Sequence, residues 1–265
     1  MSKGPNRGHL SLRWVYCPEA HASGQAVELD AAHAKHLTGV LRLEQGAAIA
    51  VANGAGAAFH ALLRVRGKAV SVELGEAVPV PPRMQPGFRV ALGLPKNTAA
   101  DFAVEKLAEL GATAFEPFVT SRSVVRPGRG DEEKYVNRWR GIAAEALEQS
   151  QQAWVLNVTA PRSFTEIIST IKTSKAACFL FASESRNGST LGQGASLMAE
   201  AVAQGKELFL VLGPEGGFST EERKDLVAAG CRELSMGPAV LRVETAVVVA
   251  ATLACLAMEQ AELQT

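Results

Sequence analysis

The chain has no excess of either charge and few cysteines. Its 27 lysines and arginines balance 27 aspartates and glutamates among 265 residues. A neutral chain does not coat nucleic acid by bulk attraction, so any RNA binding must come from local basic patches. The four cysteines, at positions 17, 178, 231 and 255, have no CxxC spacing. We therefore predict neither a zinc site nor a disulfide framework, and we expect a reducing compartment.

The sequence also lacks a segment suited to a membrane. The longest apolar run, Thr245 to Met258, is shorter than the roughly 20 residues that a bilayer span needs. No N-terminal stretch has the apolar core of a secretory signal. We expect this run to form a helix buried in a core or a subunit interface. The predicted location is cytoplasmic without a membrane partner, and an organelle location after loss of a transit peptide stays open.

Two common kinds of ligand site are missing as well. All five histidines lie in the first 60 residues, and His33 and His36 have no further metal ligands near them in the sequence. We interpret both as surface residues on one helical face and predict no metal. No G-x-G-x-x-G follows a strand, because Gly192-Gln193-Gly194 lacks the third glycine, and no G-x-x-x-x-G-K-[ST] is present. The sequence thus disfavours dinucleotide and phosphate-cradling loops.

Two glycine-containing loops stand out instead. The first, Leu212-Gly213-Pro214-Glu215-Gly216-Gly217-Phe218-Ser219, follows an apolar run typical of a buried strand, Glu207 to Leu212. It precedes a helix that Ser219 or Thr220 can cap. The second, Met236-Gly237-Pro238 to Ala246, follows a short strand candidate, Cys231 to Ser235, and enters a long helix. Because both loops leave strands of one expected sheet, they could face each other across a single site.

The rest of the chain indicates two regions. From about Arg13 to Val78, short apolar runs are separated by turns, a pattern typical of a small β-barrel. Four prolines then follow within 78–86, which predicts a semi-rigid linker. Beyond it, strand and helix patterns alternate, which predicts a parallel sheet covered on both faces.

The pair of glycine loops resembles the signature of the RsmE-type ribosomal RNA methyltransferases, which belong to the SPOUT class of knotted enzymes. The resemblance includes the upstream segments Leu94–Lys96, Glu105–Gly111, Ser121–Ser123, Glu145–Ser150 and His36–Leu43. It implies an α/β fold in which a small PUA-like β-barrel that binds RNA, 1–80, is followed by a proline-rich linker, 81–87. A SPOUT-type parallel-sheet domain with a C-terminal trefoil knot, 88–265, completes the expected fold. Periodicity by itself cannot show a knot.

The resemblance also implies the reaction, the cofactor and the partners. The expected reaction is methylation of N3 of a uridine in small-subunit (16S-type) ribosomal RNA, within an assembled small ribosomal subunit, by a homodimer. S-adenosyl-L-methionine is the expected cofactor. The cofactor-binding residues implied by the two loops are Leu212, Gly213, Pro214, Glu215, Gly216, Gly217, Leu234, Met236, Gly237, Leu241, Arg242, Thr245 and Ala246.

Methyl transfer from a sulfonium requires in-line placement, exclusion of water and the handling of one proton. Glu215 is a candidate base or ligand-orienting carboxylate, and Arg242 is a candidate cation for the developing anionic base. Each has another interpretation. Glu215 could have a purely structural role, holding its own loop in place, and Arg242 could pair with Glu244 or a helix end.

Candidate RNA-binding residues come from separate segments: Arg42, Lys96, Arg122, Arg126, Glu145 and Gln149. Arg122 falls in the Ser-Arg-Ser segment of the resemblance. Lys96 follows a strand end, at the edge where α/β sheets usually bind ligands. Glu145 and Gln149 share a helical face, which could contact RNA or a partner subunit.

One segment departs from the family pattern. Members commonly continue after Glu-Gln-Ser with Gly-Arg and a proline, whereas Gln151-Gln152-Ala153 follows Ser150 here. The missing arginine leaves a second hypothesis open, a catalytically inactive knotted RNA-binding or ribosome-assembly protein. The intact cofactor loops favour the enzyme.

Overall fold

The computed structural model describes residues 12–67, 69–128, 130–182 and 188–263, so the first eleven residues of the expected N-terminal domain lie outside it. The chain divides into two compact units, Met1–Pro82 with Ala144–Val155, and Arg83–Ala143 with Leu156–Thr265. The second unit begins inside the predicted linker. Ala144–Val155 lies within the predicted domain 88–265, whereas the structure groups this segment with the first unit.

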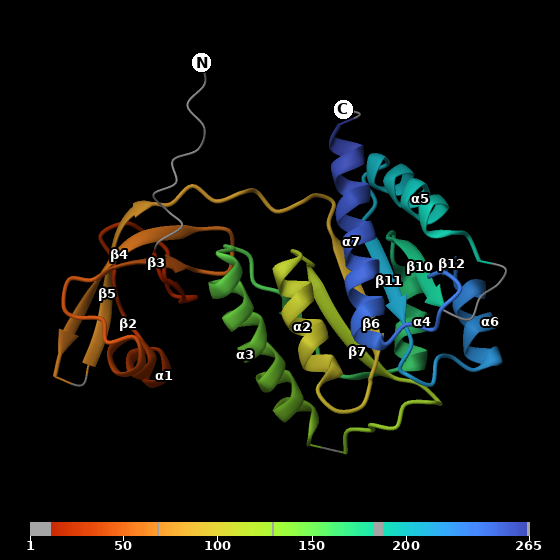
Figure 1. Cartoon of the computed structure of the whole chain (residues 1–265), viewed down its shortest axis with the longest axis horizontal. Helices are drawn as coiled ribbons and strands as arrows, with labels where there is room; N and C mark the ends of the chain where they lie inside the picture. Colours follow the sequence, from red (N-terminus) through yellow and green to blue (C-terminus); the bar gives the residue numbers. More distant parts are fainter. Residues whose placement is uncertain (1–11, 68, 129, 183–187, 264–265) are drawn as a thin grey trace. The chain divides into compact units, whose positions relative to one another are not determined.

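The first unit is built on a five-stranded sheet in the order β1-β3-β4-β5-β2. Its elements are β1 (Trp14–Tyr16), β2 (Ala26–Glu28), α1 (Ala31–Lys35), the π-helical η2 (His36–Val40), β3 (Ala48–Ala52), β4 (Ala58–Arg66) and β5 (Ala69–Ala77). The predicted turn between β3 and β4 is present: the Asn53 side chain accepts hydrogen bonds from the N–H groups of Ala55 (2.8 Å) and Ala57 (3.1 Å). The turn pattern therefore correctly indicated a β-rich N-terminal region (Figure 1).

The end of α3 (Glu132–Ser150) is held in the first unit by packing and by charge. Leu147 is buried in a cluster with Trp14, Ala50 and other apolar residues of the sheet. Glu148 Oε1 accepts from the N–H of Tyr16 (2.8 Å) and lies 3.2 Å from Nε2 of His33. The hydrogen bond with Glu148, with a smaller contribution from Asp30, raises the pKa of His33 to about 9. At neutral pH His33 is therefore protonated, and its contact with Glu148 helps to hold the end of α3 in the first unit.

The second unit is a parallel α/β domain, as predicted. Its sheet has the order β12-β10-β11-β6-β7-β8, with β9 also paired to β7. The strands are β6 (Phe88–Gly93), β7 (Ala114–Val119), β8 (Asn157–Val158), β9 (Arg162–Ser163), β10 (Ala177–Ala182), β11 (Leu208–Leu212) and β12 (Arg232–Ser235). The strands β8 and β9 have only two residues each, too few for the sequence pattern to indicate.

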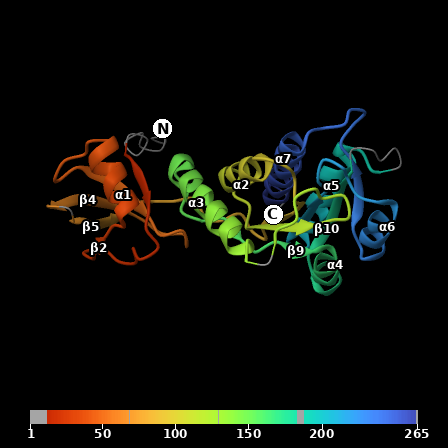
Figure 2. The ribbon, with the colours of Figure 1, turned by 90° about the horizontal axis from the view of Figure 1, so that it is seen from below.

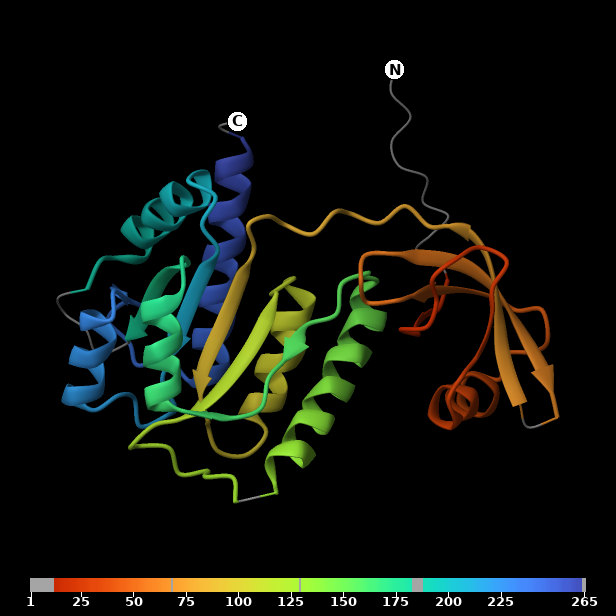
Figure 3. The same cartoon turned by 180° about the vertical axis from the view of Figure 1, so that it is seen from behind.

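Helices cover both faces of this sheet (Figures 1 and 3). One face carries α4 (Phe164–Thr173) and α6 (Thr220–Ala228), whose Ile167, Ile171 and Leu226 pack against alternate strand residues such as Phe209. The opposite face carries α2 (Ala99–Glu109), α5 (Leu191–Ala203) and α7 (Val243–Glu262), with α7 packed against α5, α2 and β11. The view from below shows α2 and α7 together on the side away from α4 (Figure 2).

The strand β12 lies between the two ends of the connection that joins β10 to α5. On one side it pairs with β10, where Ala182 is in register with Ser235. On the other, Ser189 N–H donates to Glu233 O (3.1 Å) and Ser235 N–H donates to Ser189 O (2.8 Å). The β10–α5 connection therefore begins and re-emerges on opposite sides of β12.

The prediction of no disulfide is wrong for one pair. Cys178, in β10, and Cys231, next to β12, are joined by a disulfide, with their Cα atoms 4.6 Å apart. The two cysteines are 53 residues apart in sequence, and the parallel pairing of β10 with β12 brings them together. Linear spacing carries no signal of this pairing. Cys17 and Cys255 are free thiols.

The helix α7 is longer than the apolar run that predicted it. By length and composition it could cross a membrane, yet its buried residues pack within the α/β unit. Those buried residues are mainly small: Val243, Val247, Ala250, Ala251, Ala254, Ala257, Met258 and Ala261. Of the larger side chains, Leu256 is 44% exposed, and Val249 and Leu253 are half-buried.

Candidate functional site

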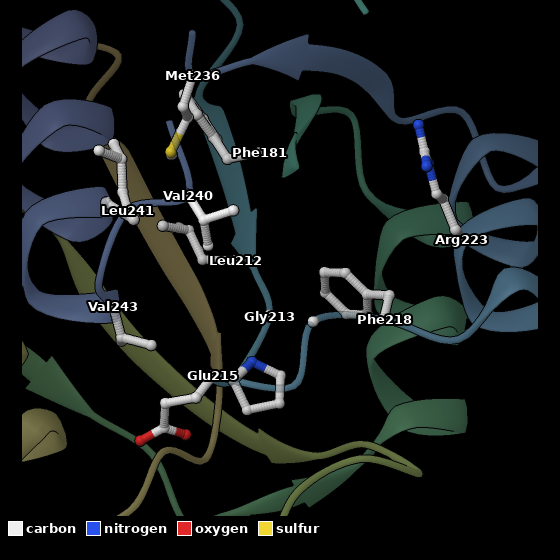
Figure 4. Close-up of a pocket in the computed structure, with 13 residues that line it drawn as sticks. Phe181, Leu212, Gly213, Glu215, Phe218, Arg223, Met236, Val240, Leu241 and Val243 are labelled. Atoms are coloured by element: carbon white, nitrogen blue, oxygen red, sulfur yellow. The ribbon is translucent and has the colours of Figure 1, made fainter. Parts of the chain in front are cut away.

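A pocket lies at the carboxyl edge of the α/β sheet, where the two glycine loops leave β11 and β12 (Figure 4). In parallel sheets this edge is the usual place for ligands. Many predicted cofactor residues line the pocket: Leu212, Gly213, Pro214, Glu215, Gly217, Met236, Leu241 and Ala246. The sequence analysis missed Phe181, Phe218, Arg223, Val240 and Val243. The two loops therefore do share one site.

The pocket wall is apolar in its middle and charged at its ends. Phe181, Leu212, Met236, Val240 and Leu241 contribute the apolar surface. Figure 4 shows the Glu215 carboxylate at one end and Arg223 across the pocket, beyond Phe218. Such a wall suits a ligand with a flat apolar part and a charged part.

The first loop is held in a tight turn. Gly217 N–H donates to Pro214 O (2.8 Å), and Gly217 has φ +63°. Because a Cβ on Gly217 would meet no protein atom within 4 Å, the constraint at this position is its backbone conformation. At Gly93, the last residue of β6, the constraint is space: a Cβ there would lie 2.5 Å from Cδ of Pro214.

Three loops at this edge are tied together by hydrogen bonds. Lys96 N–H, after β6, donates to Glu215 Oε1 (2.8 Å). Arg122 Nη1, after β7, donates to Gly216 O (2.9 Å). Ser121 N–H donates to Glu222 Oε1 (2.6 Å). The loops after β6, β7 and β11 therefore form one connected rim.

Glu222 has two roles in this rim. It completes the capping box of α6 with Ser219, the N-cap that the sequence predicted, and its other carboxylate oxygen accepts from Ser121. Its side chain is buried, with 8% of the residue exposed. The capping-box spacing predicts the first role, whereas the link to Ser121 depends on the tertiary structure.

The remaining predicted cofactor residues lie on the same segments but outside the pocket wall. Leu234 is fully buried, and a Cβ on Gly194 of α5 would meet its side chain, so it belongs to the core. Gly216 packs against Arg122, and Gly237, at φ +102°, has open space beside it. Thr245 is exposed in the first turn of α7.

The two candidate catalytic residues differ in their surroundings. Glu215 lines the pocket and has one carboxylate oxygen engaged by Lys96 N–H. Arg242 is the N-cap residue of α7 and is exposed, between the pocket-lining residues Leu241 and Val243. Within the described part of the chain it makes no ion pair, so the alternative in which it pairs with Glu244 is not observed.

The candidate RNA-binding residues separate into two groups. Lys96, Arg122 and Arg126 are exposed on the rim, where Arg126 Nη2 also donates to Thr120 O (3.0 Å) and Ser121 O (3.1 Å). Arg42, Glu145 and Gln149 are exposed in the segments that belong to the first unit. Arg42, at φ +53°, lies two residues after the end of η2.

The chain is similar to proteins of a known family, and the matched region includes the two loops at this edge of the sheet. Residues 84–255 match the family model described as an RNA methyltransferase domain. The chain is 31% identical over 244 residues to the ribosomal RNA small subunit methyltransferase E of Synechocystis sp., covering 91% of this chain and 76% of that protein. It belongs to the ribosomal RNA small subunit methyltransferase E family. The Bacillus subtilis methyltransferase E is 33% identical over 157 residues, 59% of this chain and 60% of the relative.

Solved structures extend the relationship to this methyltransferase family in three dimensions. A Neisseria gonorrhoeae ribosomal RNA small subunit methyltransferase E bound to S-adenosyl methionine superposes with a TM-score of 0.79 at 26% identity, covering 91% of this chain and 95% of that one. A Legionella pneumophila methyltransferase in complex with the same cofactor gives a TM-score of 0.81 at 27% identity, covering 92% and 96%. In this chain, the pocket-forming loops lie inside the span of the family model.

Proposed function

We propose that this chain is an S-adenosylmethionine-dependent methyltransferase that modifies N3 of a uridine in small-subunit ribosomal RNA. The observation that carries the proposal is the single pocket formed by the two glycine loops at the sheet's carboxyl edge. Two further observations support the proposal: the family to which the chain belongs, and the S-adenosyl methionine bound in the Neisseria and Legionella structures. The pocket fits that cofactor chemically, since it offers apolar side chains for an aromatic base and loop backbone for polar atoms.

In the proposed reaction the cofactor supplies an activated methyl group, and the chain supplies placement and charge. The loops 213–217 and 236–241 would hold the cofactor and exclude water. Glu215 would orient the ligand or accept the imide proton through the carboxylate oxygen that Lys96 does not engage. Arg242, exposed beside the pocket and without an ion-pair partner among the described residues, would stabilise the anionic base as the proton leaves.

The proposal is tested with the purified chain, S-adenosylmethionine and small ribosomal subunits from a strain that lacks the modification. We expect mass spectrometry of the digested RNA to detect 3-methyluridine.

Arg242→Ala should lower kcat by about 100-fold or more without changing cofactor affinity. Glu215→Gln keeps an acceptor for Lys96 N–H, so a loss of kcat in this variant would indicate a role for the charge. Cofactor binding without methylation by the wild-type chain would instead favour the inactive ribosome-assembly protein.

We further infer that the C-terminal part is a trefoil knot and that the first unit is a PUA-like RNA-binding barrel. Support for the knot comes from β12, which lies between the two ends of the β10–α5 connection before the chain continues into α7. Support for the barrel comes from the five-stranded sheet and the exposed Arg42. The expected RNA is that of an assembled small subunit.

We also propose a homodimer formed through α7. Val249, Leu253 and Leu256 lie on one helical face and are only partly covered within the α/β unit. Leu256→Asp should place a charge in the interface and give a monomer by light scattering, with reduced methylation. The matched control is Val227→Asp, because Val227 is a similarly exposed apolar residue on α6 (48%). A wild-type monomer with full activity at micromolar concentration would contradict the dimer.

A further inference from the structure

A second hollow adjoins the cofactor pocket on the other side of the rim. This groove lies in the α/β unit between the β6–α2 connection, the first turn of α2, the loop after β7 and the start of α3. Pro95 and Asn97 line it, and Lys96 between them donates its N–H to Glu215, which lines the cofactor pocket. The Lys96–Glu215 hydrogen bond therefore links a segment that lines the groove to a residue that lines the cofactor pocket. Figure 1 shows α2 and α3 running alongside each other here.

The groove contains a fixed aromatic ring. Tyr135, on α3, is half-buried, and its ring centroid lies 5.4 Å from that of Trp139. Trp139 is itself buried, packs edge-on against Phe115 and donates its indole N–H to Asp101 (3.2 Å). Because Tyr135 is positioned on this buried support, little side-chain freedom would be lost when a flat group stacks on it.

The polar groups around Tyr135 favour a base over a cluster of phosphates. Asp101 is engaged by Arg138 through Nε (3.0 Å) and Nη2 (2.6 Å), so its charge is compensated. The groove's other charges are Asp131 and Lys134, which balance each other. Among the described residues, the Asn97 amide and the Lys134 ammonium have no hydrogen-bond or ion-pair partner, so both can bind a ligand. An aromatic ring beside an amide and a single ammonium matches an unstacked nucleotide.

We propose that this groove binds a nucleotide that flanks the target uridine in single-stranded RNA. Its base would stack on Tyr135 and bond to Asn97, and its phosphate would contact Lys134. The inference rests on the proposed function, because the Lys96–Glu215 hydrogen bond connects the groove to the pocket proposed for the methyl donor. A flanking nucleotide held there would keep the target uridine over the cofactor pocket. None of the sequence motifs pointed to Tyr135 or Asn97.

The test compares Tyr135→Ala, Tyr135→Phe and Lys134→Ala in the full chain, with unmethylated small ribosomal subunits as the probe. Tyr135→Ala should raise KM for the subunits about tenfold, the range of one lost base–aromatic stack. Its kcat and its S-adenosylmethionine affinity should match the wild type, and Tyr135→Phe should behave as the wild type. Lys134→Ala should reduce the log-log salt slope of subunit binding by about 0.7 to 0.9, unlike the exposed control Lys172→Ala on α4.

Three results would overturn the proposal. They are an unchanged KM in a folded Tyr135→Ala variant, an equal loss in Tyr135→Phe, and a parallel loss of cofactor affinity that would indicate a structural role. Subunit binding is also measured directly, without turnover. If the wild-type chain binds subunits but does not methylate them, the proposed function fails while the groove is still tested by the binding data.

Discussion

Gly93→Ala is expected to weaken S-adenosylmethionine binding about 10- to 100-fold, as estimated from the 1–3 kcal/mol that overpacking usually costs. The added Cβ would lie 2.5 Å from Cδ and 2.9 Å from N of Pro214, and 3.2 Å from Cγ2 of Thr120. Pro214 has a rigid ring, so the backbone of the first glycine loop must move. Since Gly213 to Gly217 form part of the pocket wall, that movement changes the pocket itself.

The control for this variant is Gly141→Ala. Gly141 is exposed within α3, and a Cβ there would meet nothing within 4 Å. The same substitution should leave cofactor affinity unchanged and even stabilise the helix, by up to about 1 kcal/mol. Calorimetric titration with S-adenosylmethionine measures both variants. Equal, wild-type affinities in the two folded variants would show that contact between Gly93 and Pro214 does not shape the pocket.

Glu116→Ala is expected to destabilise the α/β unit by about 3 kcal/mol, with a fall in Tm of roughly 6–12 °C. Glu116, on β7, is 4% exposed and accepts hydrogen bonds from Arg89 (2.9 Å) and Arg162. Its removal leaves two arginines largely buried beside an empty space. Arg89 keeps its contacts with Glu207 (3.2 Å) and with the Phe209 ring (4.0 Å), so the loss is smaller than for an isolated buried pair.

Glu105→Ala is the matched control in the same unit. Glu105 is 46% exposed and pairs with Lys106 at 2.7 Å on the surface of α2. Exposed pairs of this kind contribute at most about 1 kcal/mol. Scanning calorimetry resolves the two effects. If both variants melt together with the wild type, the Arg89–Glu116–Arg162 cluster contributes nothing net to stability.

Local patterns predicted most elements of the α/β unit, because they depend on neighbours in the chain. The apolar run before Gly213 forms β11, and Ser219 caps α6 as its hydroxyl and its spacing from Glu222 indicate. The boundary of the first unit was predicted less completely. Ala144–Val155 begins in α3, a helix that starts in the second unit, and the packing of Leu147 and the contacts of Glu148 show that it belongs to the first.

The candidate site also combines features that local sequence patterns predict with features that depend on the fold. The two loops and the strands they leave could be predicted from the amino-acid sequence, because glycine, proline and apolar runs act locally. The family could be predicted too, because the two motifs occur in order along the chain. Which residues line the pocket together depends on the fold, since Phe181 comes from β10 and Arg223 from the first turn of α6.

The links between loops are likewise tertiary. Glu215 meets Lys96 across a separation of 119 residues, and Glu222 meets Ser121 across 101. The Cys178–Cys231 disulfide depends on the pairing and register of β10 with β12. Strand order in a parallel sheet is set by how helices pack on both of its faces. That packing is a property of the whole folded unit, and no short sequence pattern encodes it.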